Sequence, residues 1–269
     1  MSKDDRAHGV TPGLSRDYAD RTAERQAAFV RPHLEPGMTL LDLGCGPGTI
    51  TLGLARAVSP GLVIGLDHDP QHVAEARAAA EAAGVDNVRF LVGDALSLPF
   101  EPASLDGAFE NNVFVHLADR AAAAAAELHR VVRPGGFLAA RDATADAVLW
   151  GAQTEPMARF DDLFTRWQQA RGSDIAMGSR LPRLLREAGF TRTAIDVSAD
   201  TKGTPDAVEG HAAIMRGLLD GPVGELSLER GWADADDLAR MDAAIEDWGA
   251  DPDAFFANVH VEVVGWKPR

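Results

Sequence analysis

Short hydrophobic runs alternate with amphipathic segments through the first half of the chain. The hydrophobic runs predict buried strands at residues 39–44, 62–67, 88–95, 105–112 and 133–143. The intervening segments have helical periodicity at residues 49–58, 70–84 and 119–132, and a further helix is predicted ahead of the first strand at 11–34. This order is typical of βαβ units, so we expect a parallel sheet with helices on both faces.

The pattern changes after residue 143. Five large apolar residues recur at spacings of 7, 3, 4 and 3, which predicts one helix face: Trp150, Met157, Phe160, Phe164 and Trp167. A helix at 179–190 and a strand at 193–198 are predicted next. Alternating Val259, Val261 and Val263 then predict a last strand at 257–266.

Residues 200–255 hold two helical patterns and are too long for a plain connection, so we expect a helical insertion there. The resulting domain prediction has an α/β domain at 37–199, within which 144–178 is helical. A helical cap segment at 1–36 precedes it. The insertion at 200–255 forms a further cap, and the last strand of the sheet lies at 256–269.

Composition narrows the possible partners. The 269 residues carry a formal net charge of −15, which argues against binding to nucleic acid or to an anionic membrane surface. No hydrophobic run is long enough for a membrane span, and residues 1–10 lack the apolar core of a signal peptide. We therefore expect a cytoplasmic monomer or homodimer. Its single cysteine, Cys45, permits no disulfide, and no metal-ligand cluster stands out.

The segment TLLDLGCGPGT, residues 39–49, places glycines at every second position after a buried strand. Such a turn directs free backbone N–H groups over the carboxyl edge of the sheet, where ligands bind. The dinucleotide fingerprint would require glycine at Thr49, but the third glycine falls one position early, at Gly48. Asp42 would also repel a pyrophosphate, whereas it would attract an amine or a sulfonium. The small Cys45 within the turn is interpreted as a packing residue and not as a nucleophile.

Acidic residues follow three successive strands. Asp67 ends the second strand, where a carboxylate can accept hydrogen bonds from both hydroxyls of a ribose. Asp94 follows the third strand and could accept a hydrogen bond from an adenine amino group. Together with Asp42, these acids predict a site for an adenosine that carries a cationic group.

The motifs LLDLGCGPG, GLDHDP, GDALSLPF and VVRPGGFL resemble, in order and spacing, those of the class I S-adenosylmethionine-dependent methyltransferases. The resemblance is closest to the branch related to ubiquinone and menaquinone biosynthesis. It covers residues 37–143 well and the flanking segments in outline. It implies a Rossmann-like, doubly wound, seven-stranded and mostly parallel sheet with an antiparallel last strand and a helical cap. It also implies S-adenosyl-L-methionine as cofactor.

The resemblance also implies roles for individual residues. Gly44, Cys45 and Gly46 would line the methionine part of the cofactor, with Asp42 close by, and Asp67 would hold the ribose. His68 would flank the adenine, whose edge would be read by Gly93, Asp94 and Ala95. Glu110 and Asn111 would lie near the amino acid end and the transferred methyl group. Tyr18 and Arg21 would close over the cofactor.

His116 is the candidate general base, because it lies a few residues past the fourth strand, where the methyl group should point. His33, His129, His211 and His260 are interpreted as structural or exposed. Asp142 and Trp150 are candidates for contact with a small organic acceptor, whose attacking atom is oxygen, nitrogen or carbon.

Two other functions remain open from the sequence. One is a nucleotide-dependent oxidoreductase, which the displaced third glycine and Asp42 disfavour. The other is a protein of the same fold that binds S-adenosylmethionine without transferring its methyl group.

Overall fold

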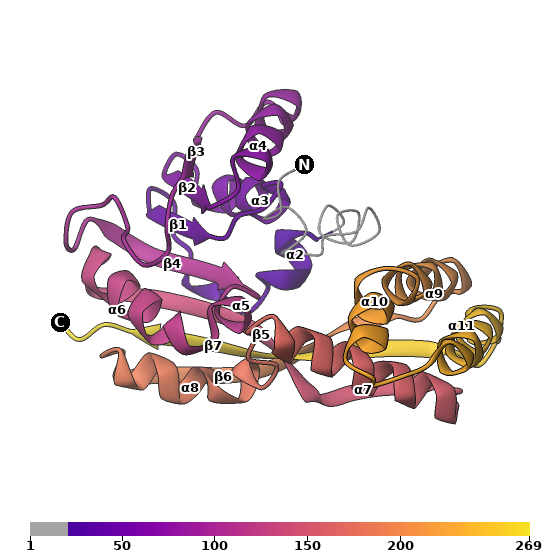
Figure 1. Cartoon of the computed structure of the whole chain (residues 1–269). Coiled ribbons are helices and arrows are strands. Elements are labelled where there is room, and N and C mark those ends of the chain that lie inside the picture. The colour runs from indigo at the N-terminus through magenta and orange to yellow at the C-terminus, as the bar shows by residue number, and fades with distance from the viewer. Residues whose placement is uncertain (1–20) are drawn as a thin grey trace. The chain divides into compact units, whose positions relative to one another are not determined.

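The computed structural model describes residues 21–269, except for the side chains of Ala145 and Asp146 (Figure 1). A seven-stranded sheet has the order β3-β2-β1-β4-β5-β7-β6. Its strands are β1 (Thr39–Leu43), β2 (Leu62–Asp67), β3 (Val88–Val92), β4 (Leu105–Asn111), β5 (Val132–Gly151), β6 (Arg192–Lys202) and β7 (Phe255–Trp266).

Five of the strands are parallel and the next one reverses. β3, β2, β1, β4 and β5 pair side by side in parallel. At the start of β5, the Gly135 N–H donates to the Lys267 carbonyl just past the end of β7, and the Lys267 N–H donates back to Gly136. β7 is therefore antiparallel to β5, and the doubly wound, mostly parallel fold predicted from the sequence is confirmed.

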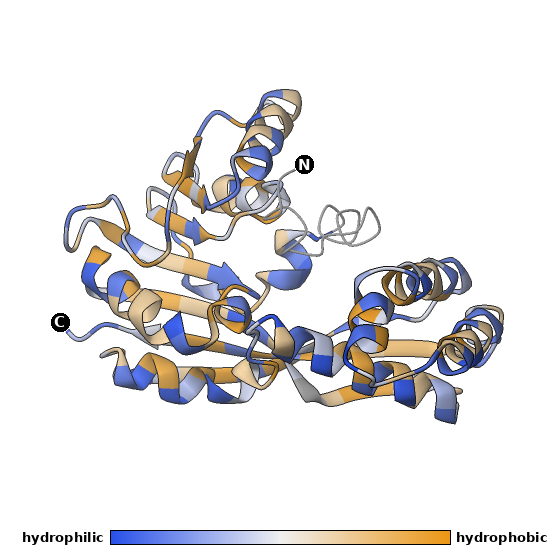
Figure 2. Ribbon diagram, in the orientation of Figure 1, coloured by the Kyte–Doolittle hydropathy of each residue, from blue (hydrophilic) through white to orange (hydrophobic). Residues whose placement is uncertain are grey.

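The helices follow the strands in alternation up to β5. They are α2 (Ala23–Gln26), α3 (Thr49–Val58), α4 (Pro70–Ala83), α5 (Phe114–Leu117), α6 (Ala121–Val131), α7 (Glu155–Ala170), α8 (Met177–Glu187), α9 (Pro205–Leu219), α10 (Pro222–Glu229) and α11 (Ala235–Gly249). Short 3₁₀ helices lie at Arg31–His33 and Ala118–Arg120. Figure 2 shows hydrophobic and hydrophilic residues alternating along most of these helices, as expected where one face is buried. No helix within 21–269 is both long and apolar enough to cross a bilayer.

Helix α4 illustrates how local sequence sets the element boundaries. The Asp69 side chain accepts a hydrogen bond from the Gln71 N–H, and Pro70 occupies the first helical position. At the other end Gly84 has φ 62°, a left-handed conformation that glycine adopts without strain. Both boundaries agree with the prediction.

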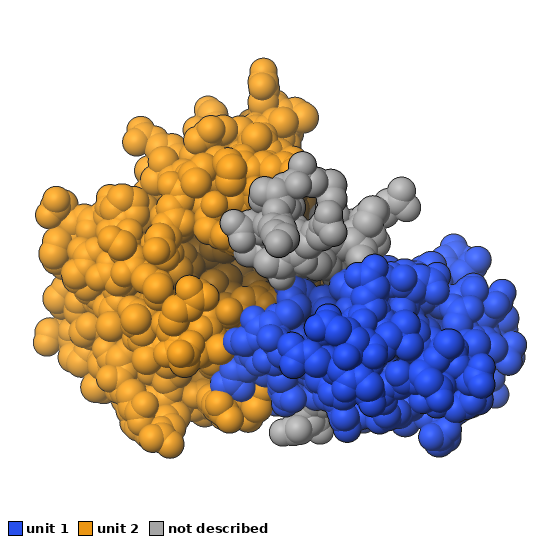
Figure 3. All heavy atoms as spheres, in the orientation of Figure 1, with its two compact units in different colours: residues 1–17, 144–175, 199–259 blue, residues 18–143, 176–198, 260–269 orange. Residues whose placement is uncertain are grey.

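The chain divides into two compact units, coloured separately in Figure 3. The larger comprises residues 18–143, 176–198 and 260–269, and within its described part the parallel strands pack against α3, α4, α6 and α8. The smaller comprises 1–17, 144–175 and 199–259; in its described part α7, α9, α10 and α11 enclose a core of their own. β5, β6 and β7 each continue from one unit into the other.

Three predictions of secondary structure were wrong. Trp150 does not share a helix with Met157, because β5 continues to Gly151 and residues 144–151 are extended. The helix begins only at Glu155, with Pro156 in its first turn, a position that proline favours over the interior of a helix that starts earlier. The predicted helical face is otherwise present, with Met157, Phe160 and Trp167 buried.

The segment 200–255 contains three helices instead of two. Pro222 at the start of α10 and the Asp234 capping box of α11 begin helices that the apolar pattern alone did not separate. The strand β6 also extends to Lys202. Ahead of β1, the described part of the predicted helix 11–34 holds only α2 and a 3₁₀ turn, in which Pro32 lacks the N–H that a continuous α-helix requires.

Candidate functional site

The glycine turn between β1 and α3 is shaped by close packing on one side and open space on the other. Gly44 has φ 68°, and a Cβ placed there would lie 2.4 Å from Cγ2 of Val113. A Cβ at Gly46, φ 52°, would meet nothing within 4 Å. Gly44 therefore lets the Val113 turn approach, whereas Gly46 exposes backbone beside open space. Cys45 is buried against Phe90 and Val73, in agreement with a packing role.

Asp67, at the end of β2, is bound to this turn. Its Oδ2 accepts the Gly46 N–H at 2.9 Å, and its Oδ1 accepts the Asp69 N–H at 3.0 Å. Nδ1 of His68 lies 3.3 Å and Nδ1 of His72 lies 3.7 Å from Oδ1. The structure thus brings together the glycine turn and Asp67, which the sequence analysis assigned to one cofactor site.

The Asp67 carboxyl is held ionised. Burial alone would raise its pKa, but hydrogen bonds from His68, His72 and the N–H groups of Asp69 and Gly46 hold the pKa well below its ordinary value. The hydrogen bond to Asp67 in turn raises the pKa of both histidines. A carboxylate can accept about four hydrogen bonds. Oδ2 accepts one hydrogen bond from Gly46 and can accept another, and the Gly46 backbone that donates to it borders open space, so the residues fit the ribose of an adenosine cofactor.

Asp42 lies deeper than its predicted role suggested. Its side chain is 3% exposed, and its Oδ2 accepts the Thr51 hydroxyl of α3 at 2.6 Å. Burial raises its pKa to about 7. The hydrogen bond from Thr51 opposes this rise, and the nearby charge of Asp67 adds to it. Its contact with a cationic ligand stays a prediction.

The residues after β3 lie at the same edge of the sheet as Asp67. Asp67 is paired with Val92, and the Gly93 N–H donates to the Asp67 carbonyl at 2.9 Å. The Asp94 side chain is exposed and its Oδ1 accepts the Leu96 N–H, which orients the loop that carries Ala95. This placement is compatible with contact to an adenine edge.

Two fully buried carboxyls lie side by side, Glu110 near the end of β4 and Asp142 in the middle of β5. Glu110 accepts the Val113 N–H at 2.9 Å and the Arg141 N–H at 3.1 Å, and Asp142 accepts the Val115 N–H at 3.0 Å. Burial, and then the nearby Asp142 charge, raise the pKa of Glu110 well above its ordinary value. The pair is therefore expected to retain a proton and to anchor the turn into α5, while direct contact with cofactor or acceptor stays a prediction for both residues.

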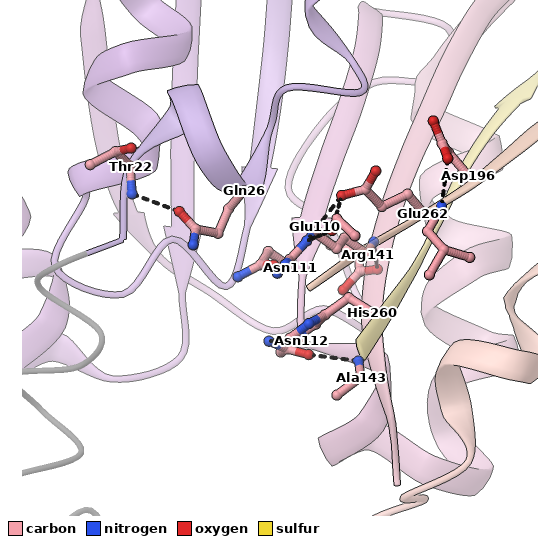
Figure 4. Close-up of polar contacts among 12 residues, drawn as sticks. Thr22, Gln26, Glu110, Asn111, Asn112, Arg141, Ala143, Asp196, His260 and Glu262 are labelled. Atoms are coloured by element: carbon pink, nitrogen blue, oxygen red, sulfur yellow. Dashed lines mark hydrogen bonds and ion pairs between the residues drawn. The ribbon is translucent and has the colours of Figure 1, made fainter. Parts of the chain in front are cut away.

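A polar network that the sequence analysis missed continues from this pair (Figure 4). Arg141 is 1% exposed; its Nη1 donates to Asn111 Oδ1 at 2.9 Å, and its Nε lies 3.2 Å from both Ser198 Oγ and Glu262 Oε1. Asn112 and His260 form a second connection between β4 and β7. His260, interpreted from the sequence as structural or exposed, is 2% exposed within this network. The signal was present, because Asn258, His260 and Glu262 alternate with the valines of the last strand.

The remaining candidates lie in other places. His116 is exposed on the short α5, just past β4. Arg21 is half-buried ahead of α2, and Tyr18 lies outside the described residues.

Trp150 belongs to an aromatic cluster in the smaller unit. Its ring centroid is 4.6 Å from that of Phe256 and 5.3 Å from that of Trp248, and the His211 ring stacks on Phe256 at 4.2 Å. Burial raises the pKa of the nearby Asp161 to about 6, although hydrogen bonds from Trp150 and Gln153 oppose it. This cluster is mostly apolar and has one titratable acid, Asp161, beside it.

Comparison with known proteins identifies the family. The model of the methyltransferase domain matches residues 40–136. "Probable methyltransferase ltbC" of Aspergillus luteorubrus is 29% identical over 92% of this chain and 92% of its own length. The O-methyltransferase resE of Aspergillus sclerotiorum is 32% identical over 72% of this chain and 69% of its own length.

A Bacillus halodurans structure described as a methyltransferase has a TM-score of 0.62. Its sequence is 18% identical to this chain, and the match covers 91% of this chain and 100% of the Bacillus halodurans chain. The likeness is therefore one of fold. On the strength of these relatives, this protein belongs to the S-adenosylmethionine-dependent methyltransferases.

We predict that Asp67→Ala abolishes cofactor binding, because it removes the ionised acceptor beside Gly46. Isothermal titration with S-adenosylmethionine measures the effect, with Asp86→Ala, an exposed acid on the loop before β3, as the control. Unchanged affinity in Asp67→Ala would contradict the assignment of the ribose site.

A second prediction concerns Asp42 and pH. Its folded-state pKa of about 7 lies above the ordinary value, so its contribution to stability is present at low pH and is lost as pH rises from about 4 to 7. Asp42→Asn keeps an acceptor for Thr51 but cannot ionise. Between these pH values the wild type should lose on the order of 4 kcal/mol of unfolding free energy relative to the variant, by urea denaturation. If the unfolding free energies of the wild type and the variant changed with pH in parallel, folding would not raise the pKa of Asp42 and the prediction would be contradicted.

Proposed function

We propose that this protein transfers the methyl group of S-adenosylmethionine to a hydroxyl of a small organic acceptor. The observation that carries the proposal is the hydrogen bond from the Gly46 N–H to the ionised Asp67 carboxylate, whose Oδ2 can accept a further hydrogen bond. This arrangement favours a ribose over a diphosphate, since a buried anion at the turn would repel phosphate groups. The O-methyltransferase among the relatives supports an oxygen nucleophile.

In this proposal each part of the site has one task. Asp67 accepts the ribose hydroxyls, Asp94 and Ala95 contact the adenine edge, and His68 flanks the ring. Gly44, Cys45 and Gly46 leave room for the amino acid end. The buried pair Glu110 and Asp142 holds the turn that carries His116 in place.

The cofactor supplies a methyl group already activated by a sulfonium, so the chain has to align the acceptor and manage one proton. Alignment alone is worth about 7–11 kcal/mol of a barrier. His116, exposed at the edge past β4, accepts the proton that the acceptor hydroxyl loses as its oxygen bonds to the methyl carbon.

Two measurements test the proposal. Calorimetry should detect binding of S-adenosylmethionine and S-adenosylhomocysteine but not of NADH. Incubation with cofactor labelled in the methyl group should then transfer label to a hydroxylated aromatic acceptor from a panel, and not to its pre-methylated analogue. Binding of NADH alone would overturn the proposal, and binding of S-adenosylmethionine without transfer to any acceptor would instead identify a non-methylating member of the fold.

His116→Ala is expected to lower kcat by about 10²–10⁴-fold, because a general base contributes that much when the acceptor must lose a proton. Affinity for S-adenosylhomocysteine should remain within about twofold, since His116 is assigned to the acceptor side of the site. Asp119→Ala, an exposed change one turn away, is the matched control. A variant that retains full activity would leave His116 without a catalytic role.

A further inference from the structure

Asn112 connects the end of β4 to the middle of β5 and of β7. Asn112 directly follows β4, and its own N–H donates to the Arg141 carbonyl of β5 at 2.8 Å. Its Oδ1 accepts the Ala143 N–H, also in β5, at 2.9 Å. Its Nδ2 lies 3.3 Å from Nε2 of His260 in β7.

These contacts define the state of His260. The Ala143 N–H can only donate, so the atom of Asn112 that faces it is the oxygen, and the Asn112 NH₂ group therefore faces His260. Because an NH₂ group donates, Nε2 of His260 accepts, and the ring is neutral with its proton on Nδ1. Reversing the Asn112 amide would set two donors against each other at Ala143.

Asn112 holds a backbone conformation that few residues adopt. Its φ is 58°, in the left-handed region, where asparagine is tolerated better than most side chains. The next residue, Val113, is the one that would collide with a Cβ at Gly44. The turn stabilised by Asn112 therefore forms a wall against which the glycine turn packs at Gly44.

We propose that His260 is a positioning residue for the cofactor site: it accepts a hydrogen bond from Asn112, which keeps Val113 packed on Gly44 and so keeps the glycine turn in the shape that binds S-adenosylmethionine. This inference rests on the proposed function. It assigns His260 no contact with cofactor or acceptor. The connection runs through β7, a strand to which the sequence motifs assign no part in cofactor binding.

Two substitutions at His260 distinguish the loss of its hydrogen bond from a change in side-chain volume. His260→Leu fills similar space but offers no acceptor to Asn112, whereas the Oε1 atom of His260→Gln can accept the same hydrogen bond. His260→Leu is expected to bind S-adenosylhomocysteine about tenfold more weakly, because a buried donor is left unpaired at the wall of the site. His260→Gln should bind within about twofold of wild type. His129→Leu, the same exchange on α6 away from this network, is the control and should bind like wild type.

Calorimetry is performed at a temperature where thermal unfolding shows each variant to be fully folded. Hydrogen exchange of the Val113 and Val115 amides, measured without ligand, gives a second readout. Exchange should be faster than in wild type for His260→Leu but not for His260→Gln or His129→Leu. Equal affinity of His260→Leu and His260→Gln would overturn the proposal, whether both bind like wild type or both bind weakly.

A third variant tests the same connection from its other end. Asn112→Gly keeps the left-handed backbone accessible but removes the side chain, and it should weaken binding as His260→Leu does. Adding His260→Leu to Asn112→Gly should then cost little more, since both remove one hydrogen bond. Fully additive losses would overturn the proposal, and so would wild-type affinity in Asn112→Gly, a result that does not depend on the stability of His260→Leu. A wild-type protein that binds no S-adenosylhomocysteine would instead refute the proposed function.

Discussion

One hydrogen bond, from the Gly46 N–H to the Asp67 carboxylate, sets the character of this edge of the sheet. It joins the turn after β1 to the end of β2, and it helps to keep the acid ionised although the side chain is almost entirely buried. A charge in such a position is tolerated only where donors surround it. Besides the hydrogen bonds from these donors, the carboxylate can accept further ones. It can therefore also recognise a diol.

The other buried acids at this edge are accommodated differently. Asp42 accepts a hydroxyl from Thr51, and its pKa is raised toward neutrality by burial. Glu110 and Asp142 lie together and accept backbone N–H groups of the turn into α5. Carboxyls of one chemical type therefore serve as a charged acceptor, a neutral buried group and an anchor, because their donor sets differ. This division of tasks keeps Asp67 ionised, while burial favours the protonated form of the other carboxyls.

Much of the fold could be predicted because its signals are local. Apolar runs, Pro70 and Gly84 at the ends of α4, and the glycines after β1 act within a few residues, and each was located correctly. The role of Trp150 was not predictable from spacing, because the extent of β5 depends on pairing with strands far along the chain. His260 and Glu262 were missed for a related reason. Their alternation in the last strand was visible, but only the fold shows that this strand lies beside β5 and that Arg141 and Asn112 face it. Side-chain partners across strands are a property of topology, which a single sequence specifies only weakly.

The strand order has a consequence for biosynthesis. β7 is the last strand along the chain, yet it lies between β5 and β6. On the ribosome, β6 emerges long before the neighbour that joins it to the sheet, and α9, α10 and α11 must be made in between. The nascent polypeptide thus carries an unpaired strand edge until β7 emerges, so the Arg141–Glu262 ion pair and the Asn112–His260 contact form only after β7 has been made.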